Sequence, residues 1–167
     1  KGHFTDVAAS MNPGIAEAGM VTGAVWADVN GDNAKELIIT GQWMATRIFT
    51  YKANRFEEHT NTNLTGLDGW WQTVAAADLN GDGKQDLVIG NIGENFYLRP
   101  DSAHPAKMWL NDFDLNGIVD QFRTQTINGK DIPLFVRRDL TEQFPSLKKE
   151  NLKNNDYANK SIQELFG

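Results

Sequence analysis

The sequence predicts a mainly β protein in which about three blade-like units form a partial β-propeller, followed by a short helical C-terminal tail. Two observations predict the β part: an acidic turn between apolar segments occurs three times, and the distance between turns fits a unit of roughly four strands. The tail is predicted because the residues after about position 133 are rich in Lys, Glu, Asn and Leu. We therefore expect propeller-type repeats over residues 1–132 and a helical tail over residues 133–167 that packs on them.

The composition excludes several classes of partner and chemistry. The 167 residues include 16 basic and 22 acidic side chains, a net charge of -6, which argues against nucleic acid or an anionic membrane surface and favours a cation. The chain has no cysteine, which excludes disulfides, thiolate zinc sites and cysteine nucleophiles. It has no apolar run long enough to span a membrane. Because it starts at Lys1 without a leader, we expect a piece of a longer protein with targeting and further domains upstream.

The repeat is visible by direct alignment. Residues 25–41, VWADVNGDNAKELIITG, align without a gap on residues 75–91, AAADLNGDGKQDLVIGN, and residues 109–125, WLNDFDLNGIVDQFRTQ, form a looser third copy. Each copy has the pattern of an apolar strand, an acidic turn and a second apolar strand, and residues 47–60 alternate apolar and polar side chains around the turn KAN. Because a single blade cannot bury both of its faces, we expect these hairpins to pack side by side.

The tail is expected to form three short helices. Asp139 is a candidate cap for the first, Pro145 fits the first turn of the second, and Ser161 is a candidate cap for the third. The apolar side chains that are candidates for docking the tail are Leu147, Leu152, Tyr157, Ile162 and Phe166. Their spacing is too irregular to define one continuous helical stripe.

The acidic turns have the ligand spacing of a calcium loop. In the second copy, the oxygen-bearing side chains at positions one, three, five and nine are Asp78, Asn80, Asp82 and Asp86. Gly81 and Gly83 permit the sharp turn between them, and the backbone carbonyl of Lys84 at position seven supplies a further oxygen. Three carboxylates this close repel one another unless a cation compensates. Calcium suits them because it takes six to eight oxygens at about 2.3 to 2.6 Å.

The other two copies repeat this spacing with differences. The third copy has Gly117 at position six, and its candidate ligands are Asp112, Asp114, Asn116, Asp120 and the carbonyl of Ile118. The candidate ligands of the first copy are Asp28, Asn30, Asp32, Glu36 and the carbonyl of Ala34. Here Asn33 replaces the glycine, and the last ligand is one methylene longer. We therefore expect Ca²⁺ at the second and third turns, and a weak site or an empty turn at the first.

An EF-hand and a magnesium site agree less well with these turns. An EF-hand requires flanking helices and a glutamate at position twelve, where the three copies have Ile39, Ile89 and Arg123. Magnesium usually keeps several waters and resists a full protein cage. The remaining alternative is that Asn, Asp and Gly are simply good hairpin residues.

The segment DLNGDGKQDLVIG, residues 78–90, closely resembles the FG-GAP or VCBS-type repeat of integrin-alpha-like β-propellers, whose pattern is an Asp-x-[Asp/Asn]-x-Asp-Gly-x-x-Asp calcium loop. The resemblance extends over the three loops. Residues 2–9, GHFTDVAA, look like the end of such a repeat, and residues 51–60, YKANRFEEHT, look like the hairpin that precedes the next loop. Residues 109–167 resemble the closing segment of large bacterial surface proteins with VCBS repeats and an ASPIC-type tail.

The resemblance implies that the family's calcium ligands carry over onto the three sets named above. It also implies an extracellular or outer-membrane-anchored protein whose propeller is a calcium-stiffened scaffold and recognition surface, with no catalytic residues. Three repeats are too few for a closed propeller. We therefore expect an open edge covered by the tail, by a partner copy or by the remaining blades of a longer chain.

Three classes of function follow from these features. The leading one is a non-enzymatic, calcium-binding module that recognises a protein or a glycan. The alternatives are a polysaccharide lyase-type enzyme, in which Trp70 and Trp71 form a sugar subsite, and a purely structural unit that caps a longer propeller. Nearly every clustered carboxylate already belongs to a calcium loop, which argues against the enzyme. The simpler interpretation of Trp70 and Trp71 is packing between blades and over a loop, with Trp26, Trp43 and Trp109 in the core.

Overall fold

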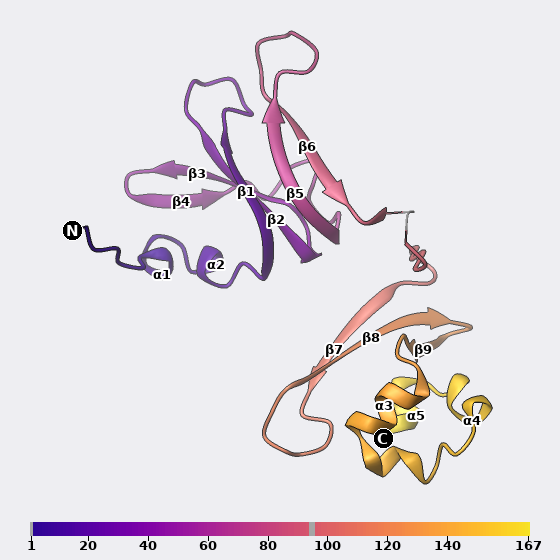
Figure 1. Ribbon diagram of the computed structural model, residues 1–167. Helices are drawn as coiled ribbons and strands as arrows, with labels where there is room; N and C mark the ends of the chain where they lie inside the picture. The colour runs from indigo at the N-terminus through magenta and orange to yellow at the C-terminus, as the bar shows by residue number, and fades with distance from the viewer. Residues whose placement is uncertain (1, 94–95) are drawn as a thin grey trace. The chain divides into compact units, whose positions relative to one another are not determined.

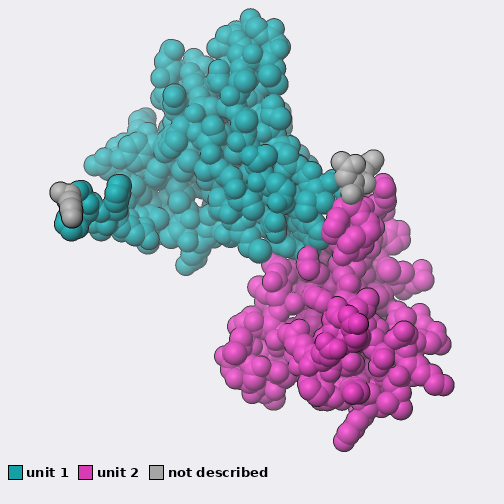
Figure 2. Space-filling model, viewed as in Figure 1, with its two compact units in different colours: residues 1–95 teal, residues 96–167 magenta. Residues whose placement is uncertain are grey.

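The computed structural model describes residues 2–93 and 96–167, and the chain divides into two compact units, residues 1–95 and 96–167 (Figures 1 and 2). Both units are built around antiparallel strands. The boundary predicted between residues 132 and 133 lies inside the second unit. Within the described residues, no helix is both long enough and apolar enough to cross a bilayer.

The first unit consists of two short helices and one antiparallel sheet. Its elements are α1 Ala8–Met11, α2 Pro13–Ala16, β1 Met20–Ala27, β2 Glu36–Met44, β3 Arg47–Lys52, β4 Arg55–Glu58, β5 Gly69–Ala77 and β6 Asp86–Asn91. β1 pairs with β2, β2 with β3 and β3 with β4, so these strands form a four-stranded meander of the expected size. β5 pairs with the end of β2 and with β6.

The predicted turn KAN is confirmed between β3 and β4. Lys52 pairs with Arg55, which leaves Ala53 and Asn54 as a two-residue loop. Their φ angles are 50° and 60°. Two consecutive positive φ values are those of a type I′ turn, whose twist matches that of the flanking strands. The chain therefore reverses tightly here and keeps β4 in register with β3.

The core of the first unit lies where the β5–β6 hairpin packs on β1 to β3. Its buried residues are Ala27, Ile38, Ile48 and Val74. A Cβ atom on Gly23 of β1 would stand 3.2 Å from the Cα atom of Thr73, so the two hairpins approach closely because residue 23 is glycine. The expected packing of one repeated hairpin on the other is therefore confirmed within this unit.

The N-terminal segment forms α1 and α2, and residues 2–9, which were expected to be the end of a repeat, contain no strand. Helix formation here has a local cause. Asn12 caps α2 by accepting a hydrogen bond from the Gly14 backbone N–H at 2.7 Å, and Pro13 occupies the first helical position. The segment then packs Ile15 and Ala18 against a buried cluster of Ile39, Met44 and Phe49.

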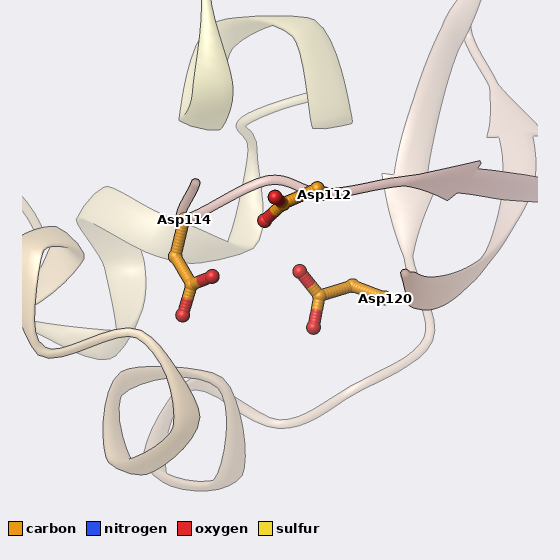
Figure 3. A group of neighbouring side chains, drawn as sticks. All are labelled: Asp112, Asp114 and Asp120. Carbon is orange, nitrogen blue, oxygen red and sulfur yellow. The ribbon is translucent and has the colours of Figure 1, made fainter. Parts of the chain in front are cut away.

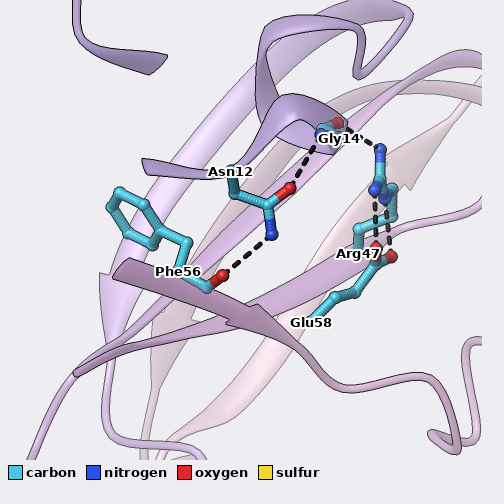
Figure 4. Close-up of polar contacts among 5 residues, drawn as sticks. All are labelled: Asn12, Gly14, Arg47, Phe56 and Glu58. Carbon is cyan, nitrogen blue, oxygen red and sulfur yellow. Dashed lines mark hydrogen bonds and ion pairs between the residues drawn. The ribbon is translucent and has the colours of Figure 1, made fainter. Parts of the chain in front are cut away.

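Polar contacts attach α2 to the β3–β4 hairpin (Figure 4). The Asn12 amide nitrogen donates to the Phe56 carbonyl at 2.8 Å, and Arg47 donates to the Gly14 carbonyl at 2.9 Å. The same guanidinium makes a bidentate pair with Glu58, with both N···O distances at 2.6 Å. Hydrogen bonding to Arg47 lowers the pKa of Glu58. Such fork-shaped pairs have a defined geometry, so α2 is held in one place on the sheet.

The second unit combines a three-stranded sheet with short helices. Its elements are β7 Ala106–Asn111, β8 Asp120–Ile127, β9 Lys130–Pro133, α3 Arg137–Gln143, the 3-10 helix η2 Pro145–Lys148, α4 Asn154–Ala158 and α5 Ile162–Phe166. The strand order is β7-β8-β9, and all pairs are antiparallel. The third repeat and the tail therefore fold together, and the boundary predicted at 132/133 falls at the end of β9.

The core of this unit is aromatic. Its buried residues are Phe122, Leu140, Phe144, Leu147, Tyr157, Ile162 and Leu165. Phe122 is 1% exposed, and its ring lies 5.3 Å from that of Phe144 and 5.1 Å from that of Phe166. The expectation that the tail packs on the strands is thus realised on β8.

The predictions for individual tail residues have mixed outcomes. Pro145 begins η2 and Ser161 caps α5, as predicted. Asp139 lies within the first turn of α3 and is not its cap, because the helix begins at Arg137 after an extended Val136. Leu147, Tyr157 and Ile162 are buried and Phe166 packs against the same core. Leu152 is 71% exposed, so its predicted docking role is wrong.

Candidate metal centre

The three acidic turns connect the paired strands of three hairpins. They join β1 to β2, β5 to β6 and β7 to β8, and each is closed by a strand pair directly before it: Ala27 with Glu36, Ala77 with Asp86, and Asn111 with Asp120. Position nine of each loop is therefore the first residue of a strand. Because this residue pairs with the residue just before position one, its carboxylate lies close to the start of the loop.

The first and last carboxylates of each loop accept the same backbone hydrogen bonds. The position-one aspartate accepts from the N–H of position six at 2.8, 2.9 and 2.8 Å in the first, second and third loops. The position-nine carboxylate accepts from the N–H of position two at 3.2, 2.9 and 3.0 Å. The three loops thus share one internal framework, although the third copy is only loosely similar in sequence.

Side-chain oxygens at positions three and five are held in the same way. Position three accepts from the N–H of position five at 2.8, 2.9 and 3.2 Å. Position five accepts from the N–H of position seven at 2.8, 2.9 and 2.8 Å, and these donors are Ala34, Lys84 and Ile118. The four predicted side-chain positions of every loop are therefore positioned by backbone donors. The ligand role of the position-seven carbonyls stays a prediction.

The backbone follows the same path through all three turns. At position six, Asn33 has a φ of 66°, against 85° for Gly83 and 87° for Gly117. At position four, Leu115 has a φ of 60° where the other loops have glycine. Asparagine tolerates this left-handed conformation better than most residues. The substitution at Asn33 therefore does not change the course of the first loop.

The third loop brings three carboxylates together (Figure 3). Oxygens of Asp112, Asp114 and Asp120 all lie within 4.8 Å of one another, and this is the one such acidic group found over residues 2–93 and 96–167. Asp120 is buried, while Asp114 is exposed at the mouth of the group. Like charges this close repel one another, and a bound cation would offset that repulsion. With only oxygen donors, the set fits a hard cation such as calcium.

The second loop has the same framework in a more exposed setting. Asp78 and Asp82 are exposed and Asp86 is half-buried. The Asn80 amide nitrogen donates to Asp82 at 3.1 Å. The Lys84 backbone N–H and this amide lower the pKa of Asp82. The donor set still consists of oxygens that fit calcium, although the three carboxylates converge less closely than in the third loop.

The first loop differs in its polar interior. Glu36 is completely buried, and its carboxylate accepts from the Val29 N–H at 3.2 Å and from the Asn30 amide nitrogen at 3.1 Å. The same nitrogen donates to Asp32 at 3.3 Å. Desolvation raises the pKa of Asp28, but hydrogen bonds from backbone N–H groups outweigh it and leave the pKa lowered. A nitrogen donor thus contacts two of the carboxylates that were expected to bind metal, so this set fits a cation less well.

Two features of the site were missed in the sequence. Gln143 of α3 donates from its side-chain nitrogen to the Asp120 carboxylate at 3.2 Å, so the tail reaches the third loop. Phe113, at position two of that loop, packs against the aromatic core and lies 4.9 Å from Phe122, centroid to centroid. No short-range spacing signals a contact between residues 23 positions apart. For Phe113, its aromatic side chain at position two of the loop is a signal in the sequence that could have indicated packing against a core.

The tryptophans agree with the expectation in part. Trp70 and Trp71 are half-buried; the Trp70 ring lies 5.1 Å from that of Trp43 in an edge contact, and the Trp71 ring nitrogen donates to the Leu67 carbonyl at 3.1 Å. Trp109 is half-buried and packs against the aromatic core, as expected, and Trp43 is also half-buried. Trp26 is 47% exposed, so its predicted core position is wrong. Neighbouring residues of a strand point to opposite faces, so Trp26 points away from the buried face on which Ala27 lies.

A segment of the first unit matches a known protein family. Residues 28–89 match the family model of the FG-GAP-like repeat. The matched segment begins at Asp28 in the first loop and ends at Ile89 in β6, so it includes the first two loops and β2 to β5 and excludes the second unit. No curated protein and no solved structure matches the chain. The segment from Asp28 to Ile89 is thus identified as an FG-GAP-like repeat region within a mainly β chain.

Proposed function

We propose that the protein is a non-enzymatic, calcium-binding module of β-propeller type that belongs to a secreted or cell-surface protein and recognises a protein or a glycan. The observation that carries this proposal is the framework shared by the three acidic loops, in which backbone N–H groups position four side-chain oxygens. The FG-GAP-like match over residues 28–89 supports it independently.

Calcium is assigned to the second and third loops. The protein oxygens proposed to bind it in the third loop are Asp112, Asp114, Asn116, Asp120 and the carbonyl of Ile118. Those in the second loop are Asp78, Asn80, Asp82, Asp86 and the carbonyl of Lys84. Calcium needs six to eight oxygens and accepts irregular geometry, so water completes each set. A bound Ca²⁺ supplies positive charge that offsets the mutual repulsion of the carboxylates.

The propeller assignment rests on how the hairpins pack. The meander of β1 to β4 has the strand number of one blade. The β5–β6 hairpin packs against it through Val74, while β5 also pairs with the end of β2. The second unit repeats the loop and hairpin with β7 to β9. Further blades of a longer chain are the proposed neighbours, and the second unit is proposed to correspond to an ASPIC-type tail of a bacterial surface protein.

A recognition role is favoured over catalysis because the acidic side chains that converge belong to a loop proposed to bind calcium. An enzyme would need a further pair of carboxylates beside the tryptophans. Glu94, a candidate for such a group, lies outside the described residues. The half-buried Trp43 and Trp70 pair can offer aromatic surface to a glycan, which a glycan-binding assay on Trp43→Ala would test against the wild type.

The first test of the proposal is thermal unfolding of metal-stripped protein in calcium, magnesium and chelator, together with a calcium titration. Ligand at about a hundred times its dissociation constant stabilises a fold by about 2.7 kcal/mol per independent site. We expect calcium to raise the Tm well above its value in magnesium, and the titration to saturate at two ions. Equal Tm values in calcium and chelator would contradict the calcium assignment.

A further inference from the structure

We infer that the first loop is closed by the side-chain amide of Asn30 in place of a cation. This inference concerns the loop at Asp28, where the FG-GAP pattern implies a metal, and it refines the proposed function by separating this loop from the other two. Asn30 is at position three, where the pattern expects an oxygen ligand.

The orientation of the Asn30 amide follows from its hydrogen bonds. Its oxygen accepts from the Asp32 backbone N–H at 2.8 Å, so the nitrogen end must point the other way, into the loop. There it donates to Asp32 at 3.3 Å and to Glu36 at 3.1 Å. One NH₂ group therefore bridges two carboxylates, which is the electrostatic role that a cation takes in such loops.

The other loops lack this bridge within the described contacts. In the second loop, the Asn80 oxygen also accepts a backbone N–H, but the described contacts of its nitrogen include only Asp82, at 3.1 Å. In the third loop the order of acid and amide is reversed. Position three is Asp114, and position five is Asn116, whose oxygen accepts from the Ile118 N–H at 2.8 Å. The three carboxylates there converge without an amide bridge.

The length and burial of Glu36 explain why the first loop can close in this way. Its extra methylene carries the carboxylate far enough to meet Asn30, whereas the second loop has the shorter Asp86. Glu36 is 0% exposed, and hydrogen bonds occupy both of its oxygens. A cation at this place would have to displace the Asn30 nitrogen from the buried Glu36 carboxylate and break the hydrogen bond that now satisfies it.

A basic side chain from the second loop also lies beside the first. A Cβ atom on Gly31 would stand 3.5 Å from the Cε atom of Lys84, so the lysine stem covers the tip of the first loop.

The direct test counts calcium ions on the full chain with three matched variants, Asp28→Asn, Asp78→Asn and Asp112→Asn, each at position one of its loop. Calorimetric titration is expected to give the wild-type count for Asp28→Asn and one ion fewer for each of the other two. Loss of one ion in Asp28→Asn would overturn the inference.

A second test needs no metal and separates this inference from the proposed function. Asn30→Asp keeps an acceptor for the Asp32 N–H but places a negative charge against the two carboxylates of Asp32 and Glu36. Asn80→Asp places a negative charge against the carboxylate of Asp82 alone. In chelator, we expect Asn30→Asp to lower the Tm by about 5 °C more than Asn80→Asp does. Equal shifts would overturn the inference. If the wild type binds no calcium, the calcium assignment fails, and this comparison still decides whether Asn30 closes the loop.

Discussion

The two units carry the same acidic loop but attach it to the fold in different ways. In the second unit, Phe113 at position two inserts into an aromatic core, and Asp120 at position nine is bonded to Gln143 of the tail. In the first unit, Leu79 at position two of the second loop is 66% exposed, whereas Val29 at position two of the first loop is half-buried against the core. The difference teaches that the hydrogen bonds of the loop are local and shared, while the packing behind position two differs from loop to loop.

The largest expected effect tests the aromatic core that supports the third loop. Phe122→Ala removes a ring that is 1% exposed and contacts the rings of Phe113, Phe144 and Phe166. We expect a loss of about 3–5 kcal/mol in the free energy of unfolding of the second unit, measured by urea unfolding. Leu152→Ala, at an exposed tail position, serves as the control and should change this free energy by less than about 0.5 kcal/mol.

The next prediction compares position two in the two units. Phe113→Ala should cost about 2–4 kcal/mol and weaken calcium binding at the third loop, because the loop loses its attachment to Phe122 and Phe166. The matched Leu79→Ala should cost less than about 0.5 kcal/mol. Urea unfolding and calcium titration on both variants measure these effects. Similar costs for the two variants would show that packing behind position two does not distinguish the units.

Gln143 is predicted to be a positioning residue for the third loop. Gln143→Ala removes the hydrogen bond to Asp120, with an expected loss of about 1 kcal/mol and a fall in calcium affinity of up to about tenfold at this loop. Calorimetric titration should show one weakened site and one unchanged site. Gln121→Ala, at an exposed position on β8, is the matched control. An unchanged affinity in Gln143→Ala would mean that the tail covers the loop without positioning it.

The smallest expected effect concerns the attachment of α5 to β9. Hydrogen bonds from Lys130, at 2.7 and 2.9 Å, and from the Ser161 backbone lower the pKa of Glu164 from 4.5 to about 2. A folded-state pKa below the unfolded value stabilises the fold at pH values above 4.5, and this contribution is lost as the pH falls through about 2.

We therefore expect Glu164→Gln to have a slightly lower Tm than the wild type at pH 6, with the two values converging as the pH approaches 2. The glutamine can still accept the Ser161 N–H bond, so the difference isolates the charge pair with Lys130. Melting curves over this pH range measure it. A constant difference in Tm at every pH would contradict the assignment to ionised Glu164.

The loops were predictable because their hydrogen bonds join residues two to seven positions apart. Spacing alone located Asp78 and Asp86 at the two ends of one turn, and Asn54 in a hairpin turn. The role of Asn30 was less accessible, because it depends on which end of an amide points inward, and a sequence does not record that orientation.

The sequence by itself determined the repeated hairpins, the acidic loops, the turn at Ala53 and Asn54, and the helical character of the tail. All of these depend on alternation, turn residues and caps that act over a few positions. Only the tertiary structure decided that Trp26 is exposed, that the third hairpin and the tail share one aromatic core, and that Gln143 reaches Asp120. Burial and contacts between distant residues depend on how whole elements pack, and that packing is not written in any short stretch of sequence.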